Sequence, residues 1–239
     1  MNRPYSLTPM HEWHERHGAQ MTDVSGWKRV VDYGDVKAEV AAINSSVGLC
    51  DVTPLSKIDV QGRHSVQMFE TLAGLLEVGE CASAVLSRAG ATQTYIARLT
   101  QDRFIALGEA EERLQLCSAL ADAALGDGCV HVTDVTSAYA ALSLVGPMST
   151  KLLKKLGPAR IDSMTTGRCL QSPDARVATL LVRRDVRDIP AWLLLVSRDY
   201  GEYLWECVLS AGHEFGILPF GTAAQRLLTG AEATDVAVV

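Results

Sequence analysis

Three histidines near the N-terminus have a spacing that raises the question of a metal site. They are His11, His14 and His17, and Glu12 and Glu15 lie between them. Imidazole and carboxylate groups are common ligands of Zn²⁺. The segment is predicted to be helical, and a helix turns by about 100° per residue, so His11 and His17 would lie about 120° apart around its axis. We therefore expect a solvated helix face here and no metal site.

A second group of charged residues precedes Trp192. The segment Arg183–Asp188 contains three arginines and two aspartates. Exposed ion pairs contribute little to stability, so one interpretation is a solvated hairpin. The other is that an arginine of this segment binds a carboxylate of a ligand or of a partner subunit, which the forked guanidinium favours. The sequence leaves both interpretations open.

The composition argues against several other kinds of chemistry. The 239 residues carry a net charge of −6, which gives no general attraction to the phosphates of nucleic acids. Six cysteines occur without a C-x-x-C pair, which argues against a zinc knuckle and a disulfide framework. A glycine-rich phosphate loop and a nucleophile elbow are both missing from the sequence. We expect no metal, flavin or nucleotide in this chain.

The apolar segments are too short for a membrane protein. The longest uncharged apolar run is Ala191–Ser197, and a membrane helix needs roughly 20 residues. The N-terminus lacks the apolar core and cleavage pattern of a secretory signal. We therefore expect a cytoplasmic protein without membrane or nucleic-acid partners.

The periodicity of apolar residues predicts a mixture of helices and strands. Because these elements do not alternate in a strict βαβ rhythm, we expect an α+β fold. The segment Gly157–Arg176 is predicted to be a long loop. Helices are predicted at Thr8–His17, Asp35–Ser46, Gly62–Leu75, Ala110–Leu125, Pro147–Leu156, Asp199–Ala211 and Ala223–Thr229. Strands are predicted at Ser56–Val60, Ala84–Ser87, Thr92–Leu99, Arg103–Leu107, Ala138–Val145, Ala178–Arg183 and Trp192–Ser197.

Two segments of the chain repeat one pattern. Asp51–Gly62 and Asp134–Gly146 both begin with Asp-Val-Thr, continue as a predicted strand and end in glycine. A serine follows three residues after each glycine, apolar residues six and seven after it, and a leucine ten after it. A strand that ends in glycine and leads into an amphipathic helix is one supersecondary unit. The repeat predicts two similar lobes, about 1–128 and 129–230, although so short a match also arises by chance.

Four segments, in this order and covering nearly the whole chain, resemble one protein family. It is the folate-binding family that contains the glycine-cleavage T-protein (aminomethyltransferase), the sarcosine and dimethylglycine oxidase domains, and tetrahydrofolate-dependent demethylases. The resemblance implies two related α+β lobes around a central pocket that binds tetrahydrofolate. The segments are Thr8–Trp27, Tyr33–Gly62, Asp134–Ser149 and Gly216–Gly230.

One departure from the family concerns the end of the chain. Active members usually continue into a C-terminal β-barrel that closes the pocket, whereas this chain ends at Val239, nine residues after Gly230. We expect a single domain at 1–230 that lacks this barrel, followed by a tail at 231–239. Loss of a wall domain should expose apolar surface that another chain covers, which predicts a hetero-oligomer.

Two acidic residues of the family's folate site are replaced. Where the family has an aspartate beside the folate nitrogen that carries the one-carbon unit, this chain offers Gln93 or Thr94. Where a glutamate holds the pterin, it has Leu193. An amide or hydroxyl donates and accepts hydrogen bonds but does not exchange a proton as a carboxylate does. Aminomethyl transfer by this chain alone is therefore the weakest of the functional hypotheses.

The resemblance nevertheless indicates which residues would contact tetrahydrofolate. Tyr95 and Arg98 are three positions apart on one predicted strand and face opposite sides, and we expect Tyr95 to line the pocket. For Leu55, Trp27 and Tyr33, packing in the core is an equally good interpretation. Arg187 is included from the charged segment, in which an arginine would meet the glutamate tail of a folate or a carboxylate of a partner subunit, and Trp192 would replace a family aromatic. The predicted cofactor residues are Leu55, Gln93, Thr94, Tyr95, Arg187, Trp192, Trp27 and Tyr33.

Two functional hypotheses follow from the resemblance. In the first, the chain is a subunit of an amine-oxidising complex of the methylamine or sarcosine type, where it binds tetrahydrofolate and captures released formaldehyde as methylene-tetrahydrofolate. In the second, it is a folate-free structural subunit, similar to the small subunit of multisubunit sarcosine oxidases. Both hypotheses imply oxidoreductase subunits as partners.

Overall fold

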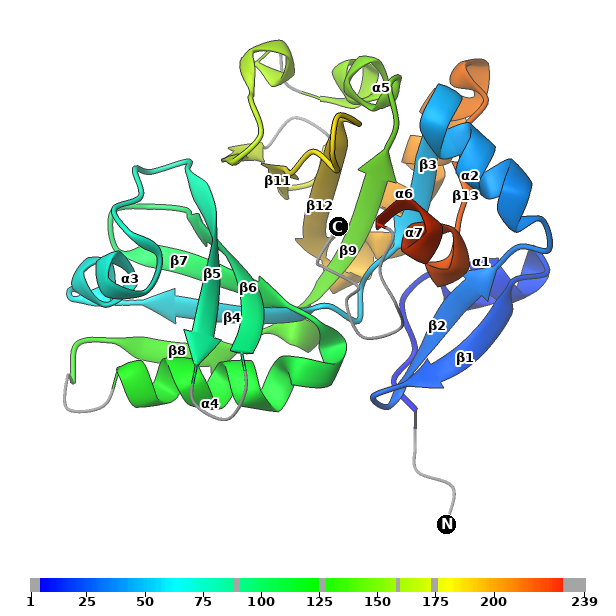
Figure 1. Cartoon of the computed structure of the whole chain (residues 1–239). Helices are drawn as coiled ribbons and strands as arrows, with labels where there is room; N and C mark the ends of the chain where they lie inside the picture. Colours follow the sequence, from blue (N-terminus) through cyan, green and yellow to red (C-terminus); the bar gives the residue numbers. More distant parts are fainter. Residues whose placement is uncertain (1–4, 88–90, 125–127, 158–159, 173–175, 230–239) are drawn as a thin grey trace.

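Two β-sheets form the centre of the protein, and helices cover their outer faces (Figure 1). The computed structural model describes residues 5–87, 91–124, 128–157, 160–172 and 176–229. The predicted C-terminal tail at 231–239 lies outside the described residues. The predicted α+β fold with two similar lobes is confirmed, and within the described residues each sheet is open.

The first lobe is a five-stranded antiparallel sheet with two helices on its outer face. A buried cluster that includes Phe69, Phe104 and Leu116 joins these helices to the sheet. The helices are α3 (Ser65–Ala73) and α4 (Arg113–Ala123). The strand order is β5 (Cys81–Ser87), β6 (Ala91–Arg98), β7 (Arg103–Gly108), β4 (Ser56–Gln61) and β8 (His131–Asp134).

The second lobe is a six-stranded sheet in which β13 is parallel to β3 and the other neighbours are antiparallel. Trp13, Trp192 and Trp205 belong to the buried cluster on its outer face. The helices there are α1 (His11–Arg16), α5 (Ser149–Leu156) and α6 (Gly201–Gly212). The strand order is β10 (Arg168–Ser172), β11 (Thr179–Arg183), β12 (Ala191–Ser197), β9 (Tyr139–Val145), β3 (Gly48–Asp51) and β13 (Leu218–Pro219).

A smaller unit lies beside the six-stranded sheet, on the right in Figure 1. It consists of the hairpin of β1 (Gln20–Val24) and β2 (Trp27–Asp32), packed with α2 (Val36–Ser45) and α7 (Thr222–Thr229). The turn of this hairpin has positive φ at Ser25 (49°) and Gly26 (82°). Glycine tolerates such a conformation without steric cost, which accounts for the Gly-Trp step of the sequence.

The first Asp-Val-Thr segment connects the six-stranded sheet to the five-stranded sheet. Asp51 Oδ1 accepts a hydrogen bond from the Thr53 N–H at 2.9 Å. Thr53 Oγ1 accepts one from the Ala141 N–H of β9 at 3.1 Å. The Val52 N–H donates to the Ala141 carbonyl at 2.9 Å. The connection is therefore tied to a strand of the other repeat.

The second Asp-Val-Thr segment makes the same contacts in the opposite direction. Asp134 Oδ1 accepts from the Thr136 N–H at 2.9 Å, and Thr136 Oγ1 accepts from the Lys57 N–H of β4 at 3.1 Å. The Val135 N–H donates to the Lys57 carbonyl at 2.9 Å. Because each contact of the first segment recurs at the matching position, the repeat in the sequence is structural and not a coincidence.

The strand pairings divide the chain differently from the predicted boundary at residues 128 and 129. β8, placed by the prediction in the second lobe, pairs with β4 of the first. β3, placed in the first lobe, pairs with β9 of the second. The strands of the five-stranded sheet thus lie within 56–134, and those of the six-stranded sheet within 48–51 and 139–219. The boundary is corrected because each repeat contributes its first strand to the sheet of the other.

All seven predicted helices are present, and their ends differ by a few residues. Strands were missed where the pattern of apolar residues is weak, as in β1 and β8, both largely exposed. β10 lies within the predicted loop Gly157–Arg176. In the part of the chain that is described, no helix combines the length and the apolar character needed to cross a membrane.

The two repeat glycines provide a test of this arrangement. Gly62 and Gly146 have φ of 144° and 138°. A Cβ added at Gly62 would lie 1.8 Å from the Cys129 carbonyl oxygen, and one at Gly146 would lie 2.4 Å from that of Ser46. We expect each of Gly62→Ala and Gly146→Ala to lower the free energy of unfolding by about 3 kcal/mol, from backbone strain and overlap.

Chemical denaturation monitored by circular dichroism measures this loss. Gly128→Ala is the matched control, because a Cβ at Gly128 meets no atom within 4 Å. If the two repeat variants were as stable as the control, the close approach of the two repeats would not be a constraint on the fold.

Candidate functional site

The facing sides of the two sheets share one buried apolar cluster. Tyr95 and Leu107 reach it from the five-stranded sheet, and Val182 and Leu193 reach it from the six-stranded sheet. Leu55, on the first crossing connection, is 4% exposed and belongs to the same cluster. Apolar side chains thus fill much of the space between the lobes. The polar groups at the edge of this cluster are therefore the candidates for contacts with a ligand.

Glu109 lies at this edge, directly after β7. Its carbonyl oxygen accepts a hydrogen bond from Ser56 Oγ at 2.7 Å, which fixes its backbone to β4. Alternation along the strand places its side chain on the same side as Leu107, toward the other lobe. Glu109 Oε1 is buried and has no hydrogen-bond partner. Burial raises the pKa of the Glu109 carboxyl to about 7, although Arg29 and Arg184 act in the opposite direction.

Arg184 approaches the same place from the end of β11. Its guanidinium carbon lies 4.9 Å from the centre of the Tyr95 ring, within the range of a cation–π contact. Arg184 Nη1 is buried without a hydrogen-bond partner. Burial lowers the pKa of this guanidinium, and the nearby Tyr95 and Glu109 raise it. The positively charged end of Arg184 therefore lies at the edge of the apolar cluster, where Glu109 also lies.

Arg29 is the third charged group, and β2 supplies it. Its side chain is 7% exposed, and its Nη1 lies 3.9 Å from Glu111 Oε1. Its Nε is buried without a hydrogen-bond partner, and its charge acts on the carboxyl of Glu109. The hairpin thus contributes a second guanidinium to the edge between the lobes. We call Arg29, Glu109, Arg184 and Tyr95 the inter-lobe polar cluster.

The inter-lobe polar cluster has the properties of a binding site for a polar, flat ligand. A buried polar atom without a partner costs about 1–3 kcal/mol, and more when it is charged, so such atoms require an explanation. Here a carboxyl near its pKa can accept or donate a hydrogen bond, two guanidiniums can donate, and an aromatic ring lies beside them. A metal centre does not fit, because the described residues contain no group of three or more potential metal ligands.

The predicted site residues on β6 lie on two different faces of the strand. Tyr95 is 6% exposed and lies in the apolar cluster between the lobes. Gln93 is exposed and, two positions earlier, faces the same side as Tyr95. Thr94 is buried, and its hydroxyl donates to the Leu107 carbonyl at 2.9 Å. Arg98 donates to the Leu76 carbonyl at 2.6 Å. Tyr95 thus lies between the lobes, and its contact with a ligand stays a prediction.

The predicted residues near β12 do not join the inter-lobe polar cluster. Trp192 is 1% exposed and lies in the cluster under α5 and α6, while its neighbour Leu193 faces the other lobe. Arg187 is exposed at the tip of the hairpin, with φ of 54°. Of the three arginines in this segment, Arg184 is the one that contacts Tyr95. The structure therefore places Trp192 and Arg187 away from Tyr95.

Trp27 and Tyr33 lie at opposite ends of β2. Trp27 is 6% exposed and shares a face of the strand with Arg29, two residues later. The Tyr33 hydroxyl instead forms a hydrogen bond with His14 Nδ1 at 2.8 Å. Tyr33 also packs against the outer cluster of the six-stranded sheet. Trp27 is thus next to the inter-lobe polar cluster, and Tyr33 belongs to a different network.

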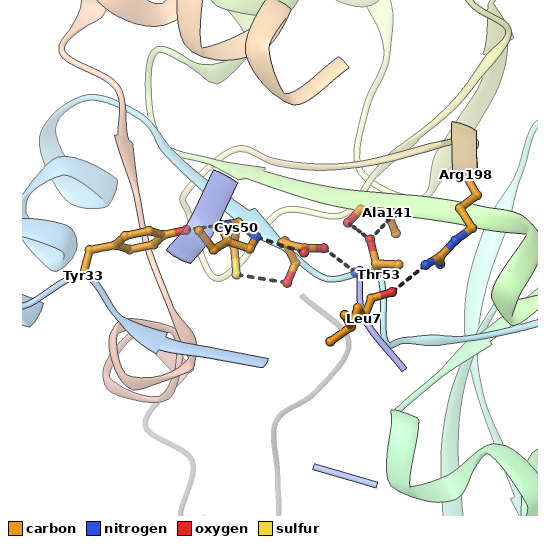
Figure 2. Close-up of polar contacts among 8 residues, drawn as sticks. Leu7, Tyr33, Cys50, Thr53, Ala141 and Arg198 are labelled. Carbon is orange, nitrogen blue, oxygen red and sulfur yellow. Dashed lines mark hydrogen bonds and ion pairs between the residues drawn. The ribbon is translucent and has the colours of Figure 1, made fainter. Parts of the chain in front are cut away.

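That network is buried beneath α1. His14 is 2% exposed, and its Nε2 lies 3.1 Å from Asp51 Oδ2. Burial alone would raise the pKa of Asp51, but the His14 hydrogen bond and charge hold it below its usual value. Figure 2 shows the polar contacts extending from Tyr33 and Cys50 to Thr53 and the first crossing connection. The expectation of a solvated histidine face is therefore wrong for His14, which anchors α1 to the repeat.

A second inter-lobe feature is a cavity of about 330 Å³. Leu99 and Ile105 line it from the five-stranded sheet, and Tyr139 and Leu195 line it from the six-stranded sheet. Arg103 also lines it and is paired with Asp59 at 2.7 Å. The eight predicted cofactor residues are all absent from its lining. This cavity is therefore distinct from the inter-lobe polar cluster.

Glu109 is not among the predicted site residues, although the sequence contains a signal for it. The predicted strands Thr92–Leu99 and Arg103–Leu107 flank a three-residue turn, which sets the register of an antiparallel hairpin. The observed pairing of Thr94 with Gly108 follows that register, and extending the register by one residue brings Glu109 opposite Gln93. Counting outward from the turn would have shown a carboxylate across from the position where an acid was expected.

The buried carboxyl predicts a pH dependence of stability. The pKa of Glu109 is 4.5 ordinarily and about 7 in the folded protein, so the folded state holds a proton that the unfolded chain releases. Stability should therefore fall as pH rises from about 4.5 to about 7, by about 2–3 kcal/mol, and stay level above that range. Glu109→Gln should abolish this part of the fall.

Urea unfolding at pH 5 and at pH 8 measures the difference between the wild-type protein and the variant. Glu206→Gln is the matched control on exposed α6 surface and should behave as the wild type. An unchanged pH dependence in Glu109→Gln would contradict the buried state of this carboxyl.

Two proteins are similar in sequence to nearly the whole of this chain. Sarcosine oxidase subunit alpha of Corynebacterium sp. (strain U-96) is 29% identical over 94% of this chain and 26% of its own length. The aminomethyltransferase of Streptomyces avermitilis is 28% identical over 92% of this chain and 61% of its own length. The chain therefore spans less than two thirds of the length of these relatives.

Solved structures of low sequence identity share the fold. The glycine cleavage system aminomethyltransferase T from Bartonella henselae matches with a TM-score of 0.80 and 21% identity, over 94% of this chain and 62% of the other. A chain of the heterotetrameric sarcosine oxidase from Corynebacterium sp. U-96 matches with a TM-score of 0.60 and 23% identity, over 75% of this chain and 92% of the other. Residues 10–233 match the GCVT N-terminal domain, and the chain belongs to that family.

Proposed function

We propose that this chain is a non-redox subunit of an amine-oxidising complex, where it binds tetrahydrofolate between its lobes and captures released formaldehyde as methylene-tetrahydrofolate. The observation that carries the proposal is the inter-lobe polar cluster. Its buried Glu109, Arg184 and Arg29 each have a polar atom without a hydrogen-bond partner. A chain that only supported other subunits would gain nothing from these unsatisfied charges.

The residues at this place fit the chemistry of a reduced folate. A pteridine is flat and carries amide-like donors and acceptors, so it suits an aromatic ring and apolar side chains beside a carboxyl and guanidiniums. Tyr95, Leu55 and Leu193 offer the apolar contacts. Arg184 and Arg29 offer donors, and Glu109 offers an acceptor or a donor. Among the predicted contacts, Leu55, Tyr95 and Gln93 remain candidates, and Trp27 is adjacent.

Capture of formaldehyde requires few catalytic groups from the protein. Formaldehyde condenses readily with the two amine nitrogens of reduced folate, so most of the benefit comes from holding those nitrogens where formaldehyde is released. This function tolerates the neutral Gln93. Stand-alone aminomethyl transfer, which the name of the Streptomyces relative suggests, demands the acidic residues that Gln93 and Leu193 replace. We therefore rank it third.

The proposed partners are the oxidising subunits of such a complex. Two relatives support this inference: one is named as a sarcosine oxidase subunit, and another is a chain of a heterotetramer. An assembly of this kind would place the captured formaldehyde next to its source, in the cytoplasm. The amine itself would be oxidised on another chain.

A second candidate function is that of a folate-free structural subunit. Two observations favour it: buried apolar side chains fill much of the space between the sheets, and the match to the heterotetramer spans 92% of one of its chains. In this case the inter-lobe polar cluster would contact water or another subunit. The two functions differ in whether the chain binds tetrahydrofolate.

Titration calorimetry with tetrahydrofolate under reducing, anaerobic conditions separates them. We expect saturable binding, weakened about 10-fold or more in Tyr95→Ala because the ring that contacts Arg184 is lost. Tyr203→Ala, at a tyrosine that is 43% exposed on α6, is the matched control and should bind as the wild type. No detectable heat at millimolar tetrahydrofolate would support the structural subunit instead.

A further inference from the structure

We propose that Glu109 is the carboxyl group that exchanges protons with the reacting folate nitrogens, from the strand opposite the position where a family aspartate was expected. This inference rests on the proposed function and gives a role to a residue that the sequence comparison left without one. It is carried by three observations: the strand register, the burial of the carboxyl and the charges around it.

The register places Glu109 directly across from Gln93. β6 and β7 pair antiparallel, with Arg98 opposite Phe104 and Thr94 opposite Gly108. Extended by one residue beyond the last observed pair, the same register brings Gln93 opposite Glu109, whose backbone is also extended. Directly opposed residues of an antiparallel pair face the same side, with Cβ atoms about 4.5–5.5 Å apart. A carboxyl on Glu109 thus reaches nearly the same space as one on residue 93.

Glu109 is held where it can act on a ligand. Ser56 Oγ binds its carbonyl oxygen at 2.7 Å, and Ala110 behind it is 6% exposed, so the backbone has little freedom. The 3₁₀ turn Ala110–Glu112 follows at once. The side chain, in contrast, has a buried oxygen without a partner. A fixed backbone with an unsatisfied carboxyl is the arrangement expected of a group that waits for a ligand.

The surroundings keep this carboxyl able to gain and lose a proton near neutral pH. Burial and the negative charges of Glu111 and Glu112 favour its protonated form, while the charges of Arg29 and Arg184 favour its ionised form. The pKa of about 7 is the balance of these effects. An acid–base group works best when its pKa lies close to the working pH. The exposed amide of Gln93 has no proton to exchange in this range.

The proposed step balances in atoms and electrons. Formaldehyde adds to one folate nitrogen, and protonated Glu109 gives its proton to the resulting hydroxyl, which leaves as water. The second folate nitrogen then forms a bond to the same carbon, and the Glu109 carboxylate takes up the proton that this nitrogen loses. Two N–H bonds and one C=O bond are replaced by two C–N bonds and one water molecule. Nothing is oxidised or reduced, and Glu109 returns to its protonated form.

Moving the carboxyl across the strand pair tests the inference. The variants are Glu109→Gln, the double variant Glu109→Gln with Gln93→Asp, and Glu206→Gln as a matched control on the exposed surface of α6. Each full-length protein is titrated with tetrahydrofolate by calorimetry in buffers of different ionisation enthalpy, which counts the protons exchanged on binding. The rate of methylene-tetrahydrofolate formation from added formaldehyde is then followed by absorbance between pH 5.5 and 8.5.

We expect Glu109→Gln to bind tetrahydrofolate within about threefold of the wild type, to lose the proton exchange near pH 7, and to condense formaldehyde about 10- to 100-fold more slowly. The double variant should regain a pH-dependent rate, because residue 93 faces the same space, and Glu206→Gln should match the wild type. Tetrahydrofolate binding with an unchanged proton count and rate profile in Glu109→Gln would overturn the role of Glu109 alone. No binding to the wild-type protein would overturn the proposed function and this inference together.

Discussion

The structure depends on two chain connections that cross between the sheets and hold each other. The segments Asp51–Thr53 and Asp134–Thr136 each leave one sheet, and each binds a strand of the other repeat, at Ala141 and at Lys57. The buried Lys57 Nζ also donates hydrogen bonds to the carbonyls of Thr53 and Leu55 at 2.7 and 2.9 Å. Because the crossings fix the sheets in one relative position, the facing sides of the two lobes form one site and not two independent surfaces.

The charged groups of the site occur where this frame brings separate elements together. Glu109 directly follows β7, Arg184 directly follows β11, and the added hairpin supplies Arg29. None of these charges has its full set of hydrogen bonds within the described residues. Pairing them with each other would have been cheaper for a purely structural protein, because a buried charge without partners is costly. The energetic cost is accounted for if the protein binds a polar ligand there, and a reduced folate has the matching groups.

The sequence predicted most of the frame, but of the four members of the inter-lobe polar cluster it singled out Tyr95 alone as a ligand contact. Periodicity and the glycine-terminated repeat were enough for the helices and the two lobes, because both are local signals. β3 and β8 were missed since four-residue strands gain their order from the partner strand, here β9 and β4. The face of Tyr95 follows from the alternation of side chains along β6, which is a local property, whereas its contact with a ligand stays a prediction. The burial of Arg184 and of His14 was not predicted. A hairpin turn decides it for Arg184 and the packing of a helix on Asp51 decides it for His14, and neither is visible in a short sequence pattern.

A crystal structure of the chain soaked or grown with 5-formyltetrahydrofolate, a stable reduced folate, tests the central claim most directly. The account predicts a pteridine ring between the lobes, against Tyr95, with Glu109 and at least one of Arg184 and Arg29 within hydrogen-bond distance of it. It would be contradicted by a structure at high ligand concentration in which the protein's own side chains close that space and the charges of Glu109, Arg184 and Arg29 are satisfied by one another.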